Sequence, residues 1–345
     1  MENNYDVFKY LKPQENTKIS DFHGYDILDI TEYINRYFLE FRDELNTSSK
    51  ATIGFEIEFE NKENSNLVPV KDTDWEIKPN WNLREDGTLE HGGEIVSPIL
   101  YNNKASWNEF LSTFQLFNDK QEITDTCSNH VHIGAQSLGN KPLFWNNFLY
   151  LWSIYENIIY RFCYGEYLNA RMLLNKYAPP IASKIDKLFK SLELEYGSFY
   201  DLSRIMPLKE YEFSHNLKDE RYHAINFLNV RNLNGFEEYN TLEFRVGNGT
   251  LNPIIIQNYA NLYLNLLEYS KSELFNRDIL DNRRSNIKYF GKLDYYNKIY
   301  FDQALEFCDL IFNNNLDKIY FLRQYLKDND TTNHIGLVKA KKFTI

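Results

Sequence analysis

Hydrophobic and polar residues alternate in three short segments of the chain, and each segment predicts a half-buried β-strand. Residues 54–60 (GFEIEFE) place three apolar side chains between glutamates, and residues 130–134 and 241–246 follow the same pattern. Successive side chains of a strand point to opposite faces. Each segment therefore predicts one apolar face, which packs on a core, and one polar face.

Other segments have helical or broken-strand patterns. Apolar positions at helical spacing predict helices over five ranges, which are residues 26–46, 103–120, 141–165, 252–270 and 301–327. Short strands broken by turn signals are expected over 75–100, and a further strand over 223–230. Residues 180–215 have a mixed pattern that predicts no regular element.

This order of elements favours an α+β fold rather than alternating β-α units. We expect a core over residues 51–270, preceded by a helical extension over 1–50 and followed by a helical segment over 271–345 packed on the core. No internal repeat or low-complexity linker interrupts the chain.

The three strands carry ionisable residues in pairs spaced two apart. The pairs are Glu56 with Glu58, His130 with His132, and Glu243 with Arg245. Residues i and i+2 of a strand share a face. Carboxylates and imidazoles bind divalent cations, and an arginine beside them suits a phosphate. The pattern therefore predicts a metal and phosphate site on one face of a sheet.

A solvated polar face is the alternative for any single alternating strand, and for residues 54–60 taken alone it is the commoner one. The three strands together argue against it, because their paired residues are of the types that bind metals and phosphates, whereas a solvated face usually mixes in threonine, serine, lysine and glutamine. Neighbouring glutamates in a groove repel one another and take up protons. Divalent cations would remove that penalty.

The segment between the first two strands adds acidic candidates. Glu94 is the strongest, because Gly92 and Gly93 before it allow a close approach of the backbone. Asp86 is a second candidate metal ligand, although Asp86 followed by Gly87 equally fits an ordinary turn.

A further segment, residues 221–234 (RYHAINFLNVRNLN), offers Arg221 and Arg231 as contacts for a phosphate or a substrate carboxylate. Both arginines equally fit a solvated surface. Asn226 and Asn229 are weaker candidates for hydrogen bonds to a ligand. Cys127 lies near His130 in sequence, but that spacing is not evidence of a thiol nucleophile with a histidine base.

Charge and composition narrow the partners. The net charge of −11 argues against a nucleic-acid or anionic-membrane surface, and it is compatible with metal ions and amines. The 3 cysteines have no CxxC spacing, which predicts neither a disulfide framework nor a zinc site. No signal-peptide pattern or apolar run long enough for a membrane span is visible, so we expect a cytoplasmic protein.

Four motifs in this order resemble the amidoligase family of the carboxylate–amine ligase superfamily, which includes glutamine synthetase and glutamate–cysteine ligase. The motifs are GFEIEFE, DGTLEHGGEIVSP, CSNHVHIGAQSL and NTLEFRVGNGTL, and the resemblance covers roughly residues 51–265. It implies an antiparallel sheet curved into a funnel, with ATP and Mg²⁺ or Mn²⁺ on its concave face. It also implies an acyl-phosphate intermediate, which an amine attacks to form an amide or peptide bond.

The resemblance assigns roles by position in the motifs. The implied metal ligands are Glu56, Glu58, Glu94, His130, Glu243 and Asp86. His132 is implied near the nucleotide phosphates, and Arg245 at the transferred phosphate. We count Arg245, Glu94 and His132 as candidate catalytic residues, and Arg221 with His132 and Arg245 as candidate nucleotide contacts.

Two other functions remain open at this point. Guanidino kinases share the superfamily's sheet, so phosphorylation of an amine or guanidine is one alternative. A non-catalytic protein that binds metal or a partner is another, although the chain has no Asp-rich calcium loop. The chain also lacks the ammonia-site loop of glutamine synthetase. The expected substrates are therefore a small-molecule or peptide carboxylate and an amine larger than ammonia.

Overall fold

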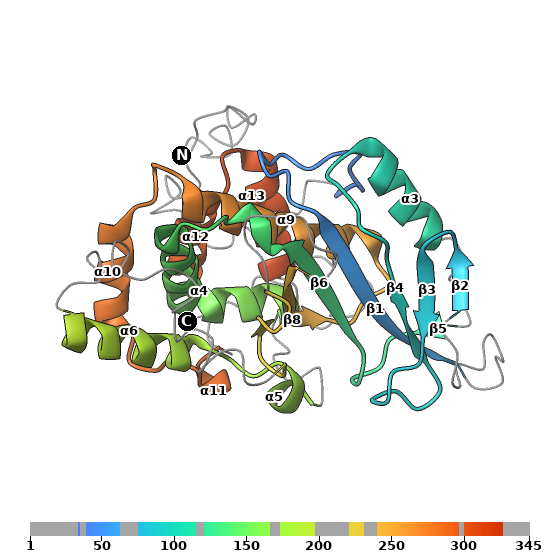
Figure 1. Ribbon diagram of the computed structural model, residues 1–345, viewed down its shortest axis with the longest axis horizontal. Coiled ribbons are helices and arrows are strands. Elements are labelled where there is room, and N and C mark those ends of the chain that lie inside the picture. Colours follow the sequence, from blue (N-terminus) through green and yellow to red (C-terminus); the bar gives the residue numbers. More distant parts are fainter. Residues whose placement is uncertain are drawn as a thin grey trace, which may run out of the picture.

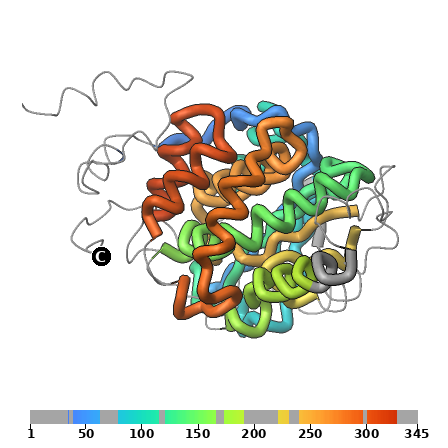
Figure 2. Tube along the Cα trace, turned by 90° about the vertical axis from the view of Figure 1, so that its left-hand side faces the viewer, coloured from blue at the N-terminus to red at the C-terminus, as the bar shows by residue number. Residues whose placement is uncertain are grey.

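The structure is a computed structural model that describes residue 34 and residues 39–62, 75–114, 121–165, 173–196, 221–230, 240–296 and 300–326. Within these residues an antiparallel sheet of eight strands lies beside a group of helices (Figure 1). Figure 2, viewed from the helical side, shows the helices in front of the strands. The protein is therefore an α+β protein with an open sheet, as the sequence predicts at this level.

All strand pairings in the sheet are antiparallel. The strands are β1 (Ile53–Asn61), β2 (Trp75–Lys78), β3 (Trp81–Arg84), β4 (Gly93–Val96), β5 (Gln121–Glu122), β6 (Ser128–Gly134), β7 (Ile225–Asn226) and β8 (Thr241–Asn248). They lie in the order β2-β3-β4-β1-β6-β8-β7, and β5 pairs with the end of β1. The three strands with ionisable pairs, β1, β6 and β8, are thus neighbours in the middle of the sheet.

The described helices are α3 (Lys104–Phe114), α4 (Pro142–Tyr164), α5 (Leu174–Tyr177), α6 (Ala182–Tyr196), α9 (Pro253–Lys271), α10 (Arg277–Asn286), α11 (Leu293–Tyr296), α12 (Phe301–Ile311) and α13 (Asn315–Tyr325), with a 3₁₀ turn at Ala135–Ser137. Local sequence signals set where the two long helices, α4 and α9, begin. Proline occupies the first position of both α4 and α9, where its missing N–H costs nothing. The side chain of Asn252 caps α9 by accepting from the N–H of Ile254.

The apolar face of the sheet packs on helices at two places. On β1, Phe55 lies 4.7 Å from Phe110 of α3, measured between ring centroids. On β8, the ring of Phe244 stacks on Tyr263 of α9 at 4.0 Å. The apolar residues of the three alternating strands are buried as predicted, and burial of each large side chain contributes about 1.5–3 kcal/mol. This packing fixes which face of each strand is left for the polar residues.

Several predicted elements differ from the structure. Residues 39–46 of the predicted helix 26–46 are not helical, and the rest, apart from Ile34, lies outside the described residues. Residues 182–196, for which no element was predicted, form α6. The strand expected over 223–230 is reduced to β7, and the helix expected over 301–327 is two helices separated at residues 312–314. These differences arise where tertiary contacts outweigh a local pattern.

Residues 39–52, the described segment directly before β1, pack through the Phe41 ring on Trp107 and Phe110 and are also held by polar contacts. Arg42 forms an ion pair with the fully buried Asp317 of α13, and the Arg42 guanidinium lies 4.5 Å from the Tyr320 ring centroid. The Arg42 backbone also exchanges hydrogen bonds with the side chain of Gln257. In the described part of the chain, no helix is both long and apolar enough to cross a membrane. The three-part division of the chain stays a prediction.

Candidate active site

The register of the central strands brings the polar pairs of all three segments together. Glu56 on β1 stands opposite His130 on β6, and His132 stands opposite Glu243 on β8. On the other side of β1, Glu58 stands opposite Glu94 of β4. Residues directly opposite in an antiparallel pair share a face of the sheet. Four strands therefore contribute ionisable side chains to one surface.

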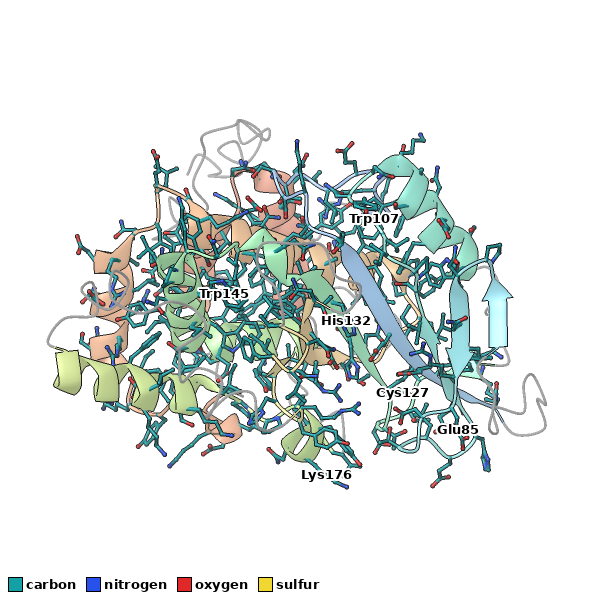
Figure 3. The ribbon with its side chains drawn as sticks, in the orientation of Figure 1. Glu85, Trp107, Cys127, His132, Trp145 and Lys176 are labelled. Atoms are coloured by element: carbon teal, nitrogen blue, oxygen red, sulfur yellow. The ribbon has the colours of Figure 1, made fainter. Side chains whose placement is uncertain are left out.

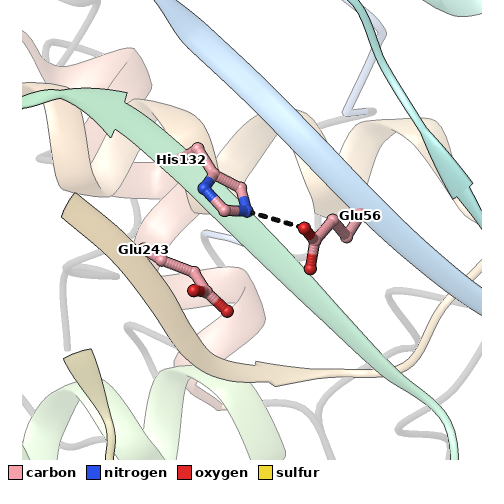
Figure 4. A group of neighbouring side chains, drawn as sticks. All are labelled: Glu56, His132 and Glu243. Atoms are coloured by element: carbon pink, nitrogen blue, oxygen red, sulfur yellow. Dashed lines mark ion pairs between the residues drawn. The ribbon is translucent and has the colours of Figure 1, made fainter. Parts of the chain in front are cut away.

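The first cluster consists of Glu56, His132 and Glu243. Each offers a ligand atom, and the three atoms lie within 4.8 Å of one another (Figure 4). His132 Nε2 is 3.3 Å from Glu56 Oε1, and Thr241 Oγ1 lies 3.3 Å from His132 Nδ1 on the other side of the ring. Two carboxylates and an imidazole form a donor set that suits a divalent transition metal or Mg²⁺ together with other oxygen ligands.

His130 lies among three carboxylates. Its Nδ1 is 2.9 Å from Glu56 Oε2 and 3.6 Å from Glu243 Oε1, whereas its Nε2 is 3.0 Å from Ser128 Oγ and 3.9 Å from Glu58 Oε1. The structure thus places His130 between the two groups of acids. The predicted division of labour, in which His130 binds metal and His132 meets phosphate, stays a prediction, and one candidate metal group contains His132 and not His130.

The second cluster consists of Glu58, Asp86 and Glu94, whose ligand atoms also lie within 4.8 Å of one another. Glu58 is buried, and its Oε2 accepts a hydrogen bond of 2.6 Å from the backbone N–H of Ser128. The Asp86 carboxylate accepts from the N–H and hydroxyl of Thr88, so the residue both forms the expected turn and faces the cluster. The two readings of Asp86 are therefore compatible.

Crowded acids change the protonation of Glu94. Burial, followed by the charges of Glu56, Asp86 and Glu58, raises the pKa of Glu94 to about 8, against a smaller opposing effect of Arg84. The chain alone thus does not neutralise this cluster. A carboxyl group with this pKa holds its proton at neutral pH until a cation replaces it.

In the first cluster, the negative carboxylates and the positive groups beside them stabilise one another. Burial would lower the pKa of His132, but Glu56 and then Glu243 raise it to about 9. Burial would also raise the pKa of Glu56, yet His132 and His130 hold it well below its ordinary value. For Glu243, the effect of burial is outweighed by His132, Arg245 and His130, which lower its pKa. Without a metal, this cluster is an imidazolium held by carboxylates.

Arg245 and Arg221 occupy different environments. The guanidinium of Arg245 is buried; its Nη1 donates to Glu243 Oε1, and its Nε donates to the carbonyl of Tyr177 at 3.3 Å. Arg221 is exposed and contacts the Tyr222 ring, with its Cζ 5.2 Å from the ring centroid. Arg245 therefore borders the first cluster directly, whereas Arg221 lies beyond it. Arg231 falls outside the described residues.

Glu60, the third glutamate of β1, has a structural role. Its two carboxylate oxygens accept hydrogen bonds of 2.8 Å from the backbone N–H groups of Glu90 and His91. These bonds hold the loop that precedes β4. The alternation of residues 54–60 alone does not distinguish Glu60 from Glu56 and Glu58.

Gly92 allows the close approach that the sequence predicts. A Cβ atom at this position would lie 1.8 Å from the carbonyl oxygen of Phe59 and 2.9 Å from the Cα of Glu60. Only glycine fits there without a shift of β1 or β4. The same loop contains Gly87, where an added Cβ would meet nothing within 4 Å.

The sequence pattern indicates some neighbours of the site only weakly and others not at all. Asn226 of β7 donates a hydrogen bond of 2.6 Å to Glu243 Oε2, so it contacts a site residue rather than open solvent. Tyr177 and Tyr222, which flank Arg245, gave no sequence signal, because nothing local links them to β8. Cys127 precedes β6 and is fully buried (Figure 3). This burial is the main reason why the pKa of its thiol is raised to about 11. A thiol nucleophile is therefore disfavoured.

Comparison with known proteins identifies one family. The family model described as "putative amidoligase enzyme" matches residues 70–267, more than half of the chain. The match spans β2 to most of α9 and includes Asp86, Glu94, both histidines of β6, and Glu243 with Arg245; β1, with Glu56 and Glu58, lies just before it. No curated protein matches the chain. The chain belongs to this amidoligase family, which places it at a coarse level among the ligases.

Proposed function

We propose that the protein is an ATP-dependent carboxylate–amine ligase that forms an amide or peptide bond through an acyl phosphate. The observation that carries this proposal is the convergence of two acidic clusters and a buried arginine on one face of the sheet. The family match supports ligase chemistry. The proposal includes a sheet curved as in glutamine synthetase, with the nucleotide and Mg²⁺ or Mn²⁺ on the polar face.

The residues present fit divalent cations. Glu56, His132 and Glu243 would hold one cation, and Glu58, Asp86 and Glu94 would hold another, with His130 between them. The raised pKa of Glu94 shows that the second cluster has more acids than its own surroundings neutralise. Bound cations would neutralise the phosphates of the nucleotide and orient the terminal one.

Arg245 is placed to stabilise the phosphoryl group in transfer. Two of its nitrogens are already anchored, one on Glu243 and one on the Tyr177 carbonyl, so the guanidinium has a fixed position. A pre-positioned cation stabilises developing negative charge more effectively than a flexible one. His132 lies on the neighbouring strand, and when no cation is bound at the first cluster it is charged and can bind a phosphate oxygen instead.

A carboxylate must be activated before an amine can displace one of its oxygens. Transfer of the terminal phosphate of ATP to the carboxylate releases ADP and gives an acyl phosphate, and attack by the neutral amine then releases inorganic phosphate. A carboxylate of the acidic surface would take the proton from the amine before the attack. The same surface would attract the amine as its ammonium form.

The proposal is tested without knowledge of the amine. The protein is incubated with ATP, Mg²⁺, a pool of amino acids and short acidic peptides, and hydroxylamine. An acyl phosphate reacts with hydroxylamine to give a hydroxamate, which is detected by its iron complex, with one phosphate released for each hydroxamate formed. Glu56→Gln should abolish the product, and Glu60→Gln, on the same strand but bonded to backbone groups, serves as the control.

Two outcomes would contradict the ligase. Formation of a phosphorylated amine or guanidine without hydroxamate would favour the phosphotransferase alternative. Absence of nucleotide binding by calorimetry, with Mg²⁺ and with Mn²⁺, would exclude both ATP-dependent reactions and favour a metal-binding or partner-binding role.

A further inference from the structure

Arg245 separates two unlike surfaces. On one side its guanidinium donates to Glu243, which belongs to the first acidic cluster. On the other side its Cζ lies 5.7 Å from the centroid of the Tyr222 ring. The ring of Tyr177 meets that of Tyr222 edge-on at 5.3 Å. The acidic face therefore ends at Arg245, and an aromatic pair begins there.

This aromatic pair carries two more cations. Arg221 Cζ lies 5.2 Å from the centroid of the Tyr222 ring, so two guanidinium groups share one ring. Lys176, a residue of the short helix α5, has its Nζ 4.8 Å from the centroid of the Tyr177 ring (Figure 3). Each such contact contributes about 0.5–1 kcal/mol at exposed sites. The rings thus hold three like charges close together.

Lys176 and Arg221 have no acidic partner in the described part of the chain. Among the residues that the structure describes, neither Lys176 nor Arg221 forms an ion pair with a carboxylate, and both are exposed. The chain as a whole has a net charge of −11, and many of its other cations are paired. A group of cations left unpaired beside an acidic site leaves space for an anion that the chain itself does not supply.

Side chains of helix α4 hold the backbone that follows Lys176 and Tyr177. Tyr160 donates from its hydroxyl to the carbonyl of Ala178, at 2.5 Å, directly after Tyr177. The fully buried carboxylate of Glu156 accepts hydrogen bonds of 2.8 and 2.9 Å from the backbone N–H groups of Ile181 and Ala182. The segment that follows Lys176 is therefore attached to the core of the protein.

The segment that carries Arg221 and Tyr222 is held by the same frame. The N–H of Ala224 donates to the carbonyl of Pro179 at 2.9 Å, and the N–H of Arg245 donates to the carbonyl of Ala224, also at 2.9 Å. These bonds join the two cation-bearing segments to each other and to β8. The backbone segments from which Lys176 and Arg221 extend are therefore fixed relative to Arg245.

We infer that Lys176, Arg221 and Tyr222, together with Arg245, form a subsite for an anionic group of the ligand that binds at the acidic clusters. Its role in substrate binding rests on the proposed function. Each ring already has a cation within 6 Å of its centroid, which favours an anionic group over a stacked base. The anion is either a carboxylate of an acidic acyl donor or part of the phosphate chain of the nucleotide.

The test compares two double variants with the same change in net charge. Lys176→Ala/Arg221→Ala removes the outer cations, and Lys187→Ala/Lys288→Ala removes two exposed lysines elsewhere. Calorimetry with Mg²⁺ measures the affinity of each protein for tripolyphosphate, MgATP, citrate and propionate. We expect the first double variant to lose about tenfold in affinity for the multivalent anions and the control to match the wild type.

The probes distinguish the source of the anion. A loss for tripolyphosphate and MgATP assigns the subsite to the phosphate chain, and a loss for citrate alone assigns it to the acyl donor. Equal affinities of the two double variants for every probe, or no binding of tripolyphosphate and citrate by the wild type, overturn the inference. A wild type that binds citrate but not MgATP, with citrate lost in the first variant, overturns the proposed function and keeps the subsite.

The aromatic ring gives an independent check. Tyr222→Phe keeps the ring and should leave the affinities unchanged, whereas Tyr222→Leu removes the support of both guanidinium groups and should weaken anion binding severalfold. Tyr222 is 40% exposed, so both variants should fold, which circular dichroism verifies. Equal binding by the leucine and phenylalanine variants would contradict the role of the ring.

Discussion

Glu56 is shared by both histidines of the neighbouring strand. It stands opposite His130 in the sheet, with Glu56 Oε2 2.9 Å from His130 Nδ1, and its other oxygen lies 3.3 Å from His132 Nε2. One carboxylate therefore connects the two imidazoles. Its loss should disturb both, and this makes it the most informative residue to change.

We predict that Glu56→Gln lowers the affinity for Mn²⁺ at least about tenfold, because the amide removes a charge and one ligand oxygen from the first cluster. Isothermal titration measures the effect. The matched control is Glu60→Gln on the same strand. It should keep the metal affinity and lose about 1–3 kcal/mol of stability, since Glu60 accepts two backbone N–H groups. If Glu56→Gln lost stability but kept its affinity for Mn²⁺, the first cluster would serve to stabilise the fold and not to bind metal.

Metal binding should release a proton from Glu94 near neutral pH. Its pKa of about 8 means that the carboxyl is protonated below that value, so a cation must displace the proton. The affinity for Mn²⁺ should therefore rise with pH from about pH 6, and it should level off only above the pKa of His132 of about 9, because that imidazole must also lose its proton to bind a cation. Calorimetry in two buffers of different ionisation enthalpy counts the released protons. Glu94→Gln should lower the number of protons released, and an unchanged number in the variant would contradict the assignment.

Arg245→Lys should lower the rate of hydroxamate formation about 100-fold, although the charge is kept. Lysine cannot hold both the Glu243 carboxylate and the Tyr177 carbonyl while it contacts a phosphoryl group. The KM for ATP should change less than kcat, because the loss concerns the transition state. A variant with normal kcat and raised KM would instead assign Arg245 to ground-state binding.

Gly92→Ala should destabilise the protein and weaken metal binding together. The added methyl group would collide with the backbone of Phe59, which forces β4 and Glu94 away from β1. We expect a loss of a few kcal/mol in the free energy of unfolding, measured by urea titration. Gly87→Ala, in the same loop, adds a methyl group to open space and is the control. Similar stability of the two variants would contradict the close approach.

Cys127 should be inert in the folded protein. It is fully buried, and its pKa is raised to about 11. The thiol form thus stabilises the fold up to about pH 9, and this contribution is lost as the pH rises through the folded pKa. Iodoacetamide at pH 8 should label it only after denaturation, as mass spectrometry would show. Cys127→Ser should keep the ligase activity, and its loss would revive a thiol mechanism.

Much of the site was predictable because strands have a period of two. Once a strand buries Phe55, Ile57 and Phe59, the intervening glutamates must share the opposite face. The same reasoning placed the two histidines of β6 and the pair on β8. Local pattern failed at residues 39–46 and at α6, where ion pairs and helix capping by distant residues, such as Asp317 and Glu156, decide the conformation.

The sequence by itself determined the strands, the residues of their polar faces and the acidic character of the site, because alternation is a local property of the chain. Only the tertiary structure decided which faces meet. The register places Glu56 against His130, gives Glu60 to a backbone loop, and sets Arg221 with Tyr222 beside Arg245. These relationships depend on pairing between distant segments, and no local pattern encodes the partner of a strand.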